Sequence, residues 1–204
     1  DAEIAAVRNC RLWNEGNEDY TMKEIFSYLD KTEYTSSGTE KLSYGDLLPL
    51  FLSVKRSRGM VYFIGNGGSA GIATHMSADF LKNGGMRTHS MLEPTTLTCL
   101  GNDFGYAFVF SRQLEIIADE GDLLVAISSS GNSPNIVNAA QVAREKGCRI
   151  VTFTGFKSDN KLRGMGDINV YVPCMEYGPV ESIHNMILQQ LVDDIVARDG
   201  MGMK

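Results

Sequence analysis

Residues 123–134 read Leu-Leu-Val-Ala-Ile-Ser-Ser-Ser-Gly-Asn-Ser-Pro, an apolar run that passes directly into small polar residues. The apolar part has the length and composition of a strand that is covered on both faces. Pro134 suits the first position of a helix, and Ser133 suits the N-cap before it. The stretch therefore predicts a strand, a loop and a helix in succession.

The same pattern recurs on both sides of this stretch. Short apolar runs predict further strands over residues 60–64, 96–100, 149–153 and 168–172. Helical periodicity predicts helices over residues 72–81, 134–146 and 181–197. Apolar strands that alternate with helices are typical of a parallel sheet covered on both faces, and such sheets bind ligands at the carboxyl ends of their strands.

Residues 1–58 have a different pattern. Apolar residues at helical spacing predict helices over residues 2–13, 21–29 and 44–55, and residues 32–40 form a polar stretch between the last two. These helices are too short and amphipathic to be stable alone, so we expect them to pack on the body or on a partner subunit. We therefore divide the chain into a helical extension, 1–58, and a main domain, 59–204.

Composition excludes several classes of protein. The 204 residues carry a net charge of −6, with a pI near 5.1, which argues against a nucleic-acid surface. The sequence has no apolar run long enough for a membrane span and no signal-peptide pattern. Its four cysteines form no CxxC motif and suit a reducing compartment. We therefore expect a cytoplasmic protein without membrane or nucleic-acid partners.

The first glycine-rich loop, residues 65–71, reads Gly-Asn-Gly-Gly-Ser-Ala-Gly between a predicted strand and a predicted helix. Glycines such as Gly67 and Gly68 let the backbone approach an anion, and the helix N-terminus adds partial positive charge. The spacing matches neither a dinucleotide fingerprint nor a P-loop, so no nucleotide cofactor is indicated. The alternative is a tight strand-to-helix turn without a ligand.

The second loop carries the stronger signal, because it contains four hydroxyls: Ser128, Ser129, Ser130 and Ser133. Capping of the following helix needs only one of them. A phosphate group would explain the others, since small donors at a helix N-terminus satisfy its oxygens. The alternative is that the loop only caps the helix.

With these loops in view, the sequence resembles the sugar isomerase (SIS) family, and within it the phosphoheptose isomerase branch. The resemblance rests on residues 65–69, 101–105, 121–133 and 143–147, and it extends over residues 60–197. It implies a flavodoxin-like three-layer α/β sandwich with a five-stranded parallel sheet and an N-terminal helical layer. It also implies a homotetramer with active sites at subunit interfaces.

The branch converts sedoheptulose 7-phosphate to D-glycero-D-manno-heptose 7-phosphate, which feeds heptose into lipopolysaccharide, S-layer or capsule. Carried over by motif, the resemblance implies that the phosphate is held by Ser69, Ser128, Ser130 and Ser133, with Ser129 beside them. It also implies that Asn66 and Asp103 contact sugar hydroxyls.

Moving a carbonyl between neighbouring carbons through an enediol needs a positioned acid/base group. The branch supplies a His and a Glu from the helix after the first loop, and a Gln and a His from the last helix. Here these positions hold His75, Asp79, Glu181 and Gln189. In the family the four positions converge as a metal and acid/base cluster, with zinc in some members.

This sequence departs from the family pattern in its last helix. Gln189 replaces a histidine, and an amide accepts no proton near neutral pH. The four residues still offer nitrogen and oxygen ligands for zinc or another divalent ion. Glu181 could serve as the base if burial or Asp79 raises its pKa. His184 is either structural or a replacement for the missing base.

Three functions remain open at this point. The first is an aldose–ketose isomerase of sedoheptulose 7-phosphate, which the two carboxylates and the phosphate loops favour. The second is a non-catalytic SIS protein that senses a phosphosugar or acts as a scaffold, which the loss of the histidine favours. The third is an isomerase of a different sugar phosphate, with specificity altered by Asp79 and Asn83. We rank the first highest, because residues at the site say more than the fold.

Overall fold

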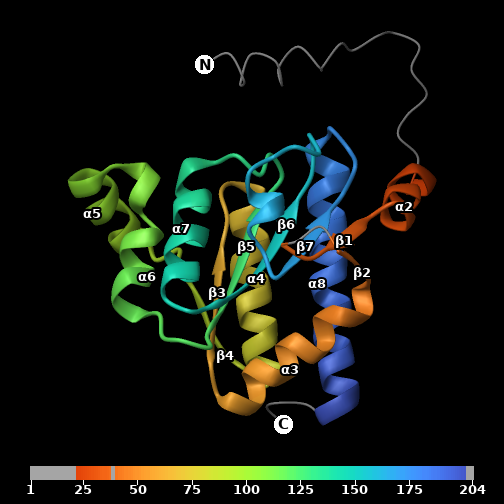
Figure 1. Ribbon diagram of the computed structural model, residues 1–204, viewed down its shortest axis with the longest axis horizontal. Coiled ribbons are helices and arrows are strands. Elements are labelled where there is room, and N and C mark those ends of the chain that lie inside the picture. The colour runs from red at the N-terminus through yellow and green to blue at the C-terminus, as the bar shows by residue number, and fades with distance from the viewer. Residues whose placement is uncertain (1–21, 38–39, 201–204) are drawn as a thin grey trace, which may run out of the picture.

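A single sheet of seven strands, in the order β2-β1-β7-β6-β5-β3-β4, forms the centre of the molecule (Figure 1). This arrangement comes from a computed structural model, which describes residues 22–37 and 40–200. The helix expected over residues 2–13 lies outside the described residues. The strands are β1 (Glu33–Thr35), β2 (Lys41–Leu42), β3 (Met60–Ile64), β4 (Arg87–Ser90), β5 (Leu123–Ser128), β6 (Arg149–Thr154) and β7 (Ile168–Tyr171).

The expected five-stranded parallel sheet is confirmed, since β4, β3, β5, β6 and β7 pair in parallel. Two short strands extend it. β1 pairs antiparallel with β7, and β2 pairs antiparallel with β1. The polar stretch predicted over residues 32–40 therefore contains part of the sheet, which the prediction missed. A three-residue strand has little periodicity of its own, and pairing with β7 is what fixes it.

Helices cover both faces of the sheet (Figure 1). One face carries α3 (Leu47–Ser57), α4 (Gly68–Lys82) and α8 (Tyr177–Asp199), and α2 (Met22–Asp30) packs against α8. The other face carries α6 (Ser111–Ile117) and α7 (Pro134–Glu145), with α5 (Pro94–Phe104) beyond them. Three short 3₁₀ helices complete the list: η1 (Tyr44–Asp46), η2 (Tyr106–Phe108) and η3 (Leu162–Gly164). Within residues 22–37 and 40–200, no helix combines the length and the apolarity that crossing a membrane requires.

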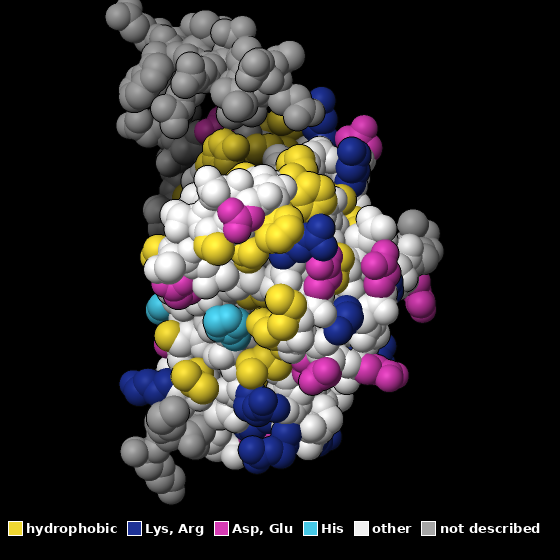
Figure 2. All heavy atoms as spheres, turned by 90° about the vertical axis from the view of Figure 1, so that its left-hand side faces the viewer, with side chains coloured by type: hydrophobic (Ala, Val, Ile, Leu, Met, Phe, Trp, Pro, Cys, Tyr) yellow, Lys and Arg dark blue, Asp and Glu magenta, His cyan; other side chains and the backbone are white. Residues whose placement is uncertain are grey.

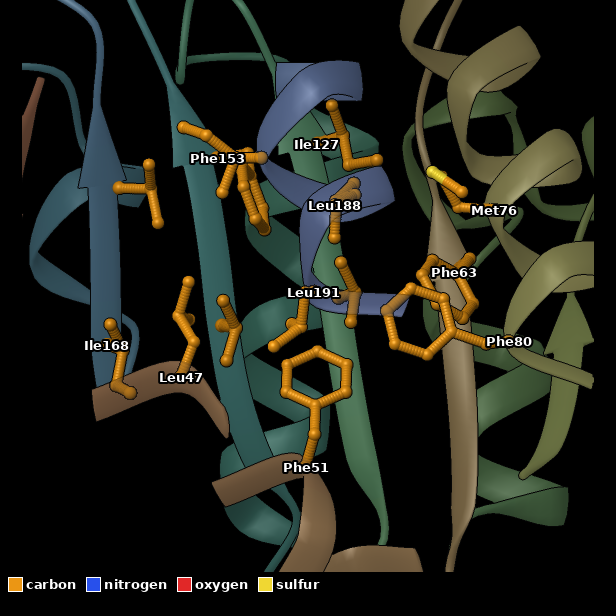
Figure 3. Packing of buried hydrophobic residues seen from close by; sticks show 14 of the residues in the cluster. Leu47, Phe51, Phe63, Met76, Phe80, Ile127, Phe153, Ile168, Leu188 and Leu191 are labelled. Atoms are coloured by element: carbon orange, nitrogen blue, oxygen red, sulfur yellow. The ribbon is translucent and has the colours of Figure 1, made fainter. Parts of the chain in front are cut away.

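The sheet divides the core into two clusters because successive strand residues point to opposite faces. In β3, Phe63 packs with α3, α4 and α8, whereas Tyr62 and Ile64 pack with the opposite layer. Figure 3 shows the first cluster, where the ring of Phe80 on α4 packs against both Phe51 of α3 and Phe63 of β3. The helix predicted over residues 44–55 thus packs on the body of the protein.

The strand predicted over residues 96–100 is wrong, because these residues belong to α5. The cause lies just upstream. The Glu93 carboxylate accepts hydrogen bonds from the backbone N–H groups of Thr95 and Thr96, at 3.1 and 2.6 Å, and Pro94 occupies the first turn. A side-chain cap and a proline at the first helical position start a helix and override the β-branched composition.

The strand order places both loops at one point. The chain leaves β3 toward β4 on one side and returns to β5 on the other side of β3. Such a reversal opens a crevice at the carboxyl ends of the two strands. The loop of residues 65–69 follows β3 and the loop of residues 128–133 follows β5, so both line this crevice.

Candidate active site

The first loop, residues 65–69, turns sharply into α4. A Cβ at Gly65 would lie 2.5 Å from the carbonyl carbon and oxygen of Ser69, so only glycine fits there. Gly67, at the N-cap of α4, has a φ of +55°, which also favours glycine. The first N–H groups of a helix have no partner within the helix. The tight turn therefore brings the first backbone N–H groups of α4 to the crevice.

The second loop, residues 128–133, holds its serines in different ways. The Ser128 and Ser130 hydroxyls accept backbone N–H bonds from Gly131 and Asn132, at 3.2 and 3.3 Å. Ser133 occupies the N-cap of α7, but its side chain makes no capping bond. Capping therefore does not explain Ser133, and its hydroxyl can serve a ligand.

Ser129 differs from its neighbours, because its hydroxyl is buried and has no hydrogen-bond partner within the described part of the chain. Its backbone carbonyl is engaged instead, and accepts a bond of 3.0 Å from the N–H of Gly155. A buried hydroxyl without a partner is costly, so it either gains a bond when a ligand arrives or marks a strained loop.

The second loop rests on the segment that follows β6. Gly131 has a φ of +62°, and a Cβ there would lie 1.9 Å from Oδ1 of the buried Asn160. Asn160 is held by Nδ2 bonds to the carbonyls of Lys157 and Gly155, and its Oδ1 accepts from the N–H of Arg163. The loop thus lies against a side chain that cannot easily move.

An amide pair joins the two loops. Asn66 Nδ2 donates to Asn135 Oδ1 at 3.0 Å, and Asn135 Nδ2 donates to Asn66 Oδ1 at 2.9 Å. The Tyr106 hydroxyl also donates to Asn66 Oδ1, at 2.9 Å. Asn66 therefore holds the two loops in position relative to each other. Sequence reasoning missed Asn135 and Tyr106. For Asn135 a signal was available, because it is a polar residue directly after Pro134, in the first turn of the helix, where the structure buries it.

Glu181 lies beside the first loop. A Cβ at Gly68 would be 2.2 and 2.5 Å from the two carboxylate oxygens of Glu181, so the carboxylate lies directly against the Gly68 backbone. Burial raises the pKa of Glu181 above that of an ordinary glutamate. Residues more than 100 positions apart in sequence thus place a carboxylate with raised proton affinity next to the predicted phosphate loop.

His75 and Asp79 form a second group on α4, with His75 Nε2 3.7 Å from Asp79 Oδ2. His75 and Asp79 are seven and eleven residues after Gly68, so they lie about 10 and about 16 Å along the helix from the Gly68 backbone that Glu181 contacts. α4 and α8 lie side by side, and both begin at the carboxyl edge of the sheet (Figure 1). Gln189 therefore lies about as far along α8 from Glu181 as His75 lies along α4 from Gly68.

The described residues therefore do not bring all four candidate ligands together in one chain. No group of three His, Cys, Asp or Glu side chains within them could hold a metal ion. His75 and Asp79 fit a metal as two neighbouring ligands, and Glu181 is remote from them.

His184 is not at the surface of the crevice. Its ring is fully buried against Phe153, and its Nε2 is 3.0 Å from the carbonyl oxygen of Thr154. Desolvation lowers the pKa of His184 to about 4, so the ring is neutral near pH 7. Of the two roles that the sequence left open, the buried location favours the structural one.

Asp103 lies on the exposed surface of α5. Its carboxylate accepts from Asn102 Nδ2 at 2.9 Å, and no described hydrogen bond joins it to either loop. Asp103 stands three residues before Tyr106. The hydrogen bond from the Tyr106 hydroxyl to Asn66 links the segment after α5 to the crevice.

A parallel sheet with two small-residue loops at its switch point, each at the start of a helix, defines a phosphate-binding α/β sandwich protein. The model of the SIS domain family matches residues 39–155. The chain is similar to the phosphoheptose isomerases of Helicobacter hepaticus, 34% identical over 151 residues, and Edwardsiella ictaluri, 37% identical over 153. These matches cover 71% and 70% of this chain and 76% and 78% of the relatives.

A solved phosphoheptose isomerase from Neisseria gonorrhoeae superposes with a TM-score of 0.72 at 25% identity, covering 96% of both chains. The chain belongs to the SIS domain family, in its phosphoheptose isomerase branch. The family resemblance inferred from the four motifs is thereby confirmed.

Proposed function

We propose that the protein is an aldose–ketose isomerase that converts sedoheptulose 7-phosphate to D-glycero-D-manno-heptose 7-phosphate through an enediol. The observation that carries the proposal is the contact between the Glu181 carboxylate and Gly68, which joins a candidate base to the phosphate loops. The names of the relatives supply the substrate. The loops of residues 65–69 and 128–133 would hold the phosphate through Ser69, Ser128, Ser130 and Ser133.

We further propose that the complete site forms between subunits. Within one chain, His75 and Asp79 lie about 10 and about 16 Å along α4 from the Gly68 backbone that Glu181 contacts, too far for one reacting centre. The His75 side chain is 55% exposed and therefore accessible to a second subunit. A neighbouring chain could thus bring its His75 and Asp79 to Glu181, in an assembly that we take to be a homotetramer.

Exposed hydrophobic side chains support an assembly of this kind. α5, η2 and α6 leave Phe104, Tyr106, Phe108, Ile116 and Ile117 exposed, and Figure 2 shows hydrophobic side chains spread over the face that these elements form. A monomer seldom exposes so many large hydrophobic residues in one region without an interaction to cover them.

In this proposal the two carboxylates move the proton, and His75 orients Asp79. Zinc or another divalent ion would polarise the sugar oxygens when bound. His75 and Asp79 would hold such an ion, with Gln189 at the same level of the sheet as a candidate third ligand.

We also propose a cytoplasmic location, which the free buried thiols of Cys148 and Cys174 suit, and a phosphosugar-binding unit over residues 59–204.

Mixing two inactive variants tests the shared site. Asp79→Asn and Gly131→Ala damage different parts, so subunits of the two variants in one oligomer rebuild some intact sites. If they mix at random, we expect about a quarter of the sites to be intact and activity to return in that proportion. The measurement is isomerase activity after the two proteins are unfolded and refolded together. No recovery in verified mixed oligomers would place the whole site in one chain.

Glu181 predicts a pH dependence. A base must be deprotonated, so kcat should fall as the pH drops through the raised pKa of Glu181. The fall should therefore begin at a higher pH than an ordinary glutamate would give. Glu181→Gln should lower kcat at least about tenfold and remove this acidic limb. The pH profile of kcat for both proteins checks this, and an unchanged profile in the variant would exclude Glu181 as the base.

A further inference from the structure

His184 is a polar residue in an apolar position. Its ring packs edge-on against Phe153, with 5.6 Å between centroids, inside the cluster between the sheet and α8. Because a carbonyl oxygen can only accept, the 3.0 Å contact with Thr154 requires the proton to be on Nε2. Nδ1 is then a buried acceptor, and it has no partner within the described residues.

This arrangement is costly for stability alone. A buried acceptor without a hydrogen bond is penalised, and a phenylalanine or leucine would fill the space without that penalty. The ring also cannot reach a substrate, because the side chain has no exposed surface. A function that uses the Nε2–H bond explains why a histidine stands here.

The bond leads directly to the second phosphate loop. The carbonyl of Thr154, which accepts from His184, belongs to the same peptide unit as the N–H of Gly155. That N–H donates to the carbonyl of Ser129 at 3.0 Å. One peptide unit therefore connects α8 to the middle of the loop of residues 128–133.

Two other contacts complete a triangle among the parts of the site. Asn66 and Asn135 join the first loop to the start of α7, directly after the second loop. Glu181 of α8 lies against Gly68 of the first loop. The His184 bond is the third side, between α8 and the second loop. A shift of the second loop relative to Glu181 would therefore have to break or bend this bond.

We propose that His184 is a positioning residue, which holds the serines of the second loop at a fixed distance from Glu181 through the 154–155 peptide unit. A substrate that is bound by its phosphate in this loop is then placed in register with the carboxylate. The packing supports the same link, because a Cβ at Gly155 would be 2.7 Å from Val180, one turn before His184 on α8. This inference rests on the proposed phosphate site.

The test compares two substitutions of similar size. His184→Phe keeps an aromatic ring against Phe153 and removes the donor, whereas His184→Gln keeps an N–H close to the position of Nε2. We expect His184→Phe to raise KM and the dissociation constant of inorganic phosphate about tenfold, with kcat changed less than about threefold. His184→Gln should restore most of the lost affinity. A folded His184→Phe protein with wild-type KM and phosphate affinity would overturn the proposal.

A measurement on the wild-type protein covers the case in which His184→Phe does not fold. In protein labelled with ¹⁵N at histidine, the neutral ring of His184 should give an Nε2–H signal at pH 7 that is protected from solvent. Titration with inorganic phosphate should shift this signal at the same concentrations that inhibit the enzyme. His89 on β4 is the control and should not respond. An unmoved His184 signal at saturating phosphate would also overturn the proposal.

The outcomes separate this inference from the proposed function. If the wild-type protein binds neither inorganic phosphate nor sedoheptulose 7-phosphate, the phosphate site itself is wrong. If it binds both, and the His184 variants and signal do not respond, the site stands and the positioning role is wrong.

Discussion

Replacing Asp79 with asparagine is expected to lower kcat by about 10³-fold, and to leave the affinity for inorganic phosphate within about twofold of the wild-type value. Asparagine keeps the shape of the side chain but can neither accept a proton nor pair with a protonated His75, which lies 3.7 Å away. Asp79 is ten residues after Ser69, about three helical turns from the first phosphate loop, so binding should survive. Steady-state kinetics with sedoheptulose 7-phosphate, and inhibition by phosphate, give both numbers.

The matched control for Asp79→Asn is Asp193→Asn. Asp193 is an exposed aspartate on α8, and its removal should leave kcat within about twofold. A kcat within threefold of wild type in Asp79→Asn would remove Asp79 from the proton transfer and leave Glu181 as the only carboxylate in the proposal.

Replacing Gly131 with alanine is expected to weaken the binding of phosphate and of substrate by at least about 100-fold. The new Cβ would fall 1.9 Å from Asn160 Oδ1, at a φ of +62° that an alanine seldom adopts. Asn160 is buried and held by three hydrogen bonds to backbone groups, so the loop has to move instead. Moving the loop displaces the hydroxyls of Ser128, Ser130 and Ser133 from the positions in which they would bind the phosphate. Calorimetric titration with inorganic phosphate checks this.

Gly164→Ala is the control for that experiment. Gly164 lies in η3, close in sequence to Asn160, and a Cβ there would meet nothing within 4 Å. It should bind phosphate with wild-type affinity. If Gly131→Ala folds and binds equally well, the loop of residues 128–133 does not hold the phosphate.

The sequence was sufficient to predict four of the five parallel strands and both loops, because these depend on local patterns, but it did not predict β4. Continuous apolar runs marked β3, β5, β6 and β7, and the small residues after β3 and β5 marked the crevice. It failed where a tertiary contact or a side-chain cap outweighs local composition. β1 exists because it pairs with β7, and α5 exists because Glu93 caps a segment that reads as a strand.

The site was predicted as a set of residues, without its arrangement. No pattern in the sequence could show that Glu181 lies against Gly68, since this contact joins the start of α4 to the start of α8 across the fold. For the same reason the family positions suggested one cluster of four residues. Within one chain, Glu181 lies near the start of α4 and α8, whereas His75, Asp79 and Gln189 lie further along these helices. Asn135 and Tyr106 act through hydrogen bonds to Asn66, and only coordinates reveal such partners.

The central claim is enediol chemistry on a ketose phosphate, and deuterium exchange tests it most directly. The purified protein is incubated with sedoheptulose 7-phosphate in deuterated water, with and without added zinc, and the carbon-bound protons are followed by NMR. We expect deuterium to enter at the carbon next to the carbonyl, even where little product accumulates, and Asp79→Asn to abolish this entry. Binding of the sugar phosphate without any exchange, under both conditions, would contradict the claim and identify the protein as a phosphosugar sensor or scaffold.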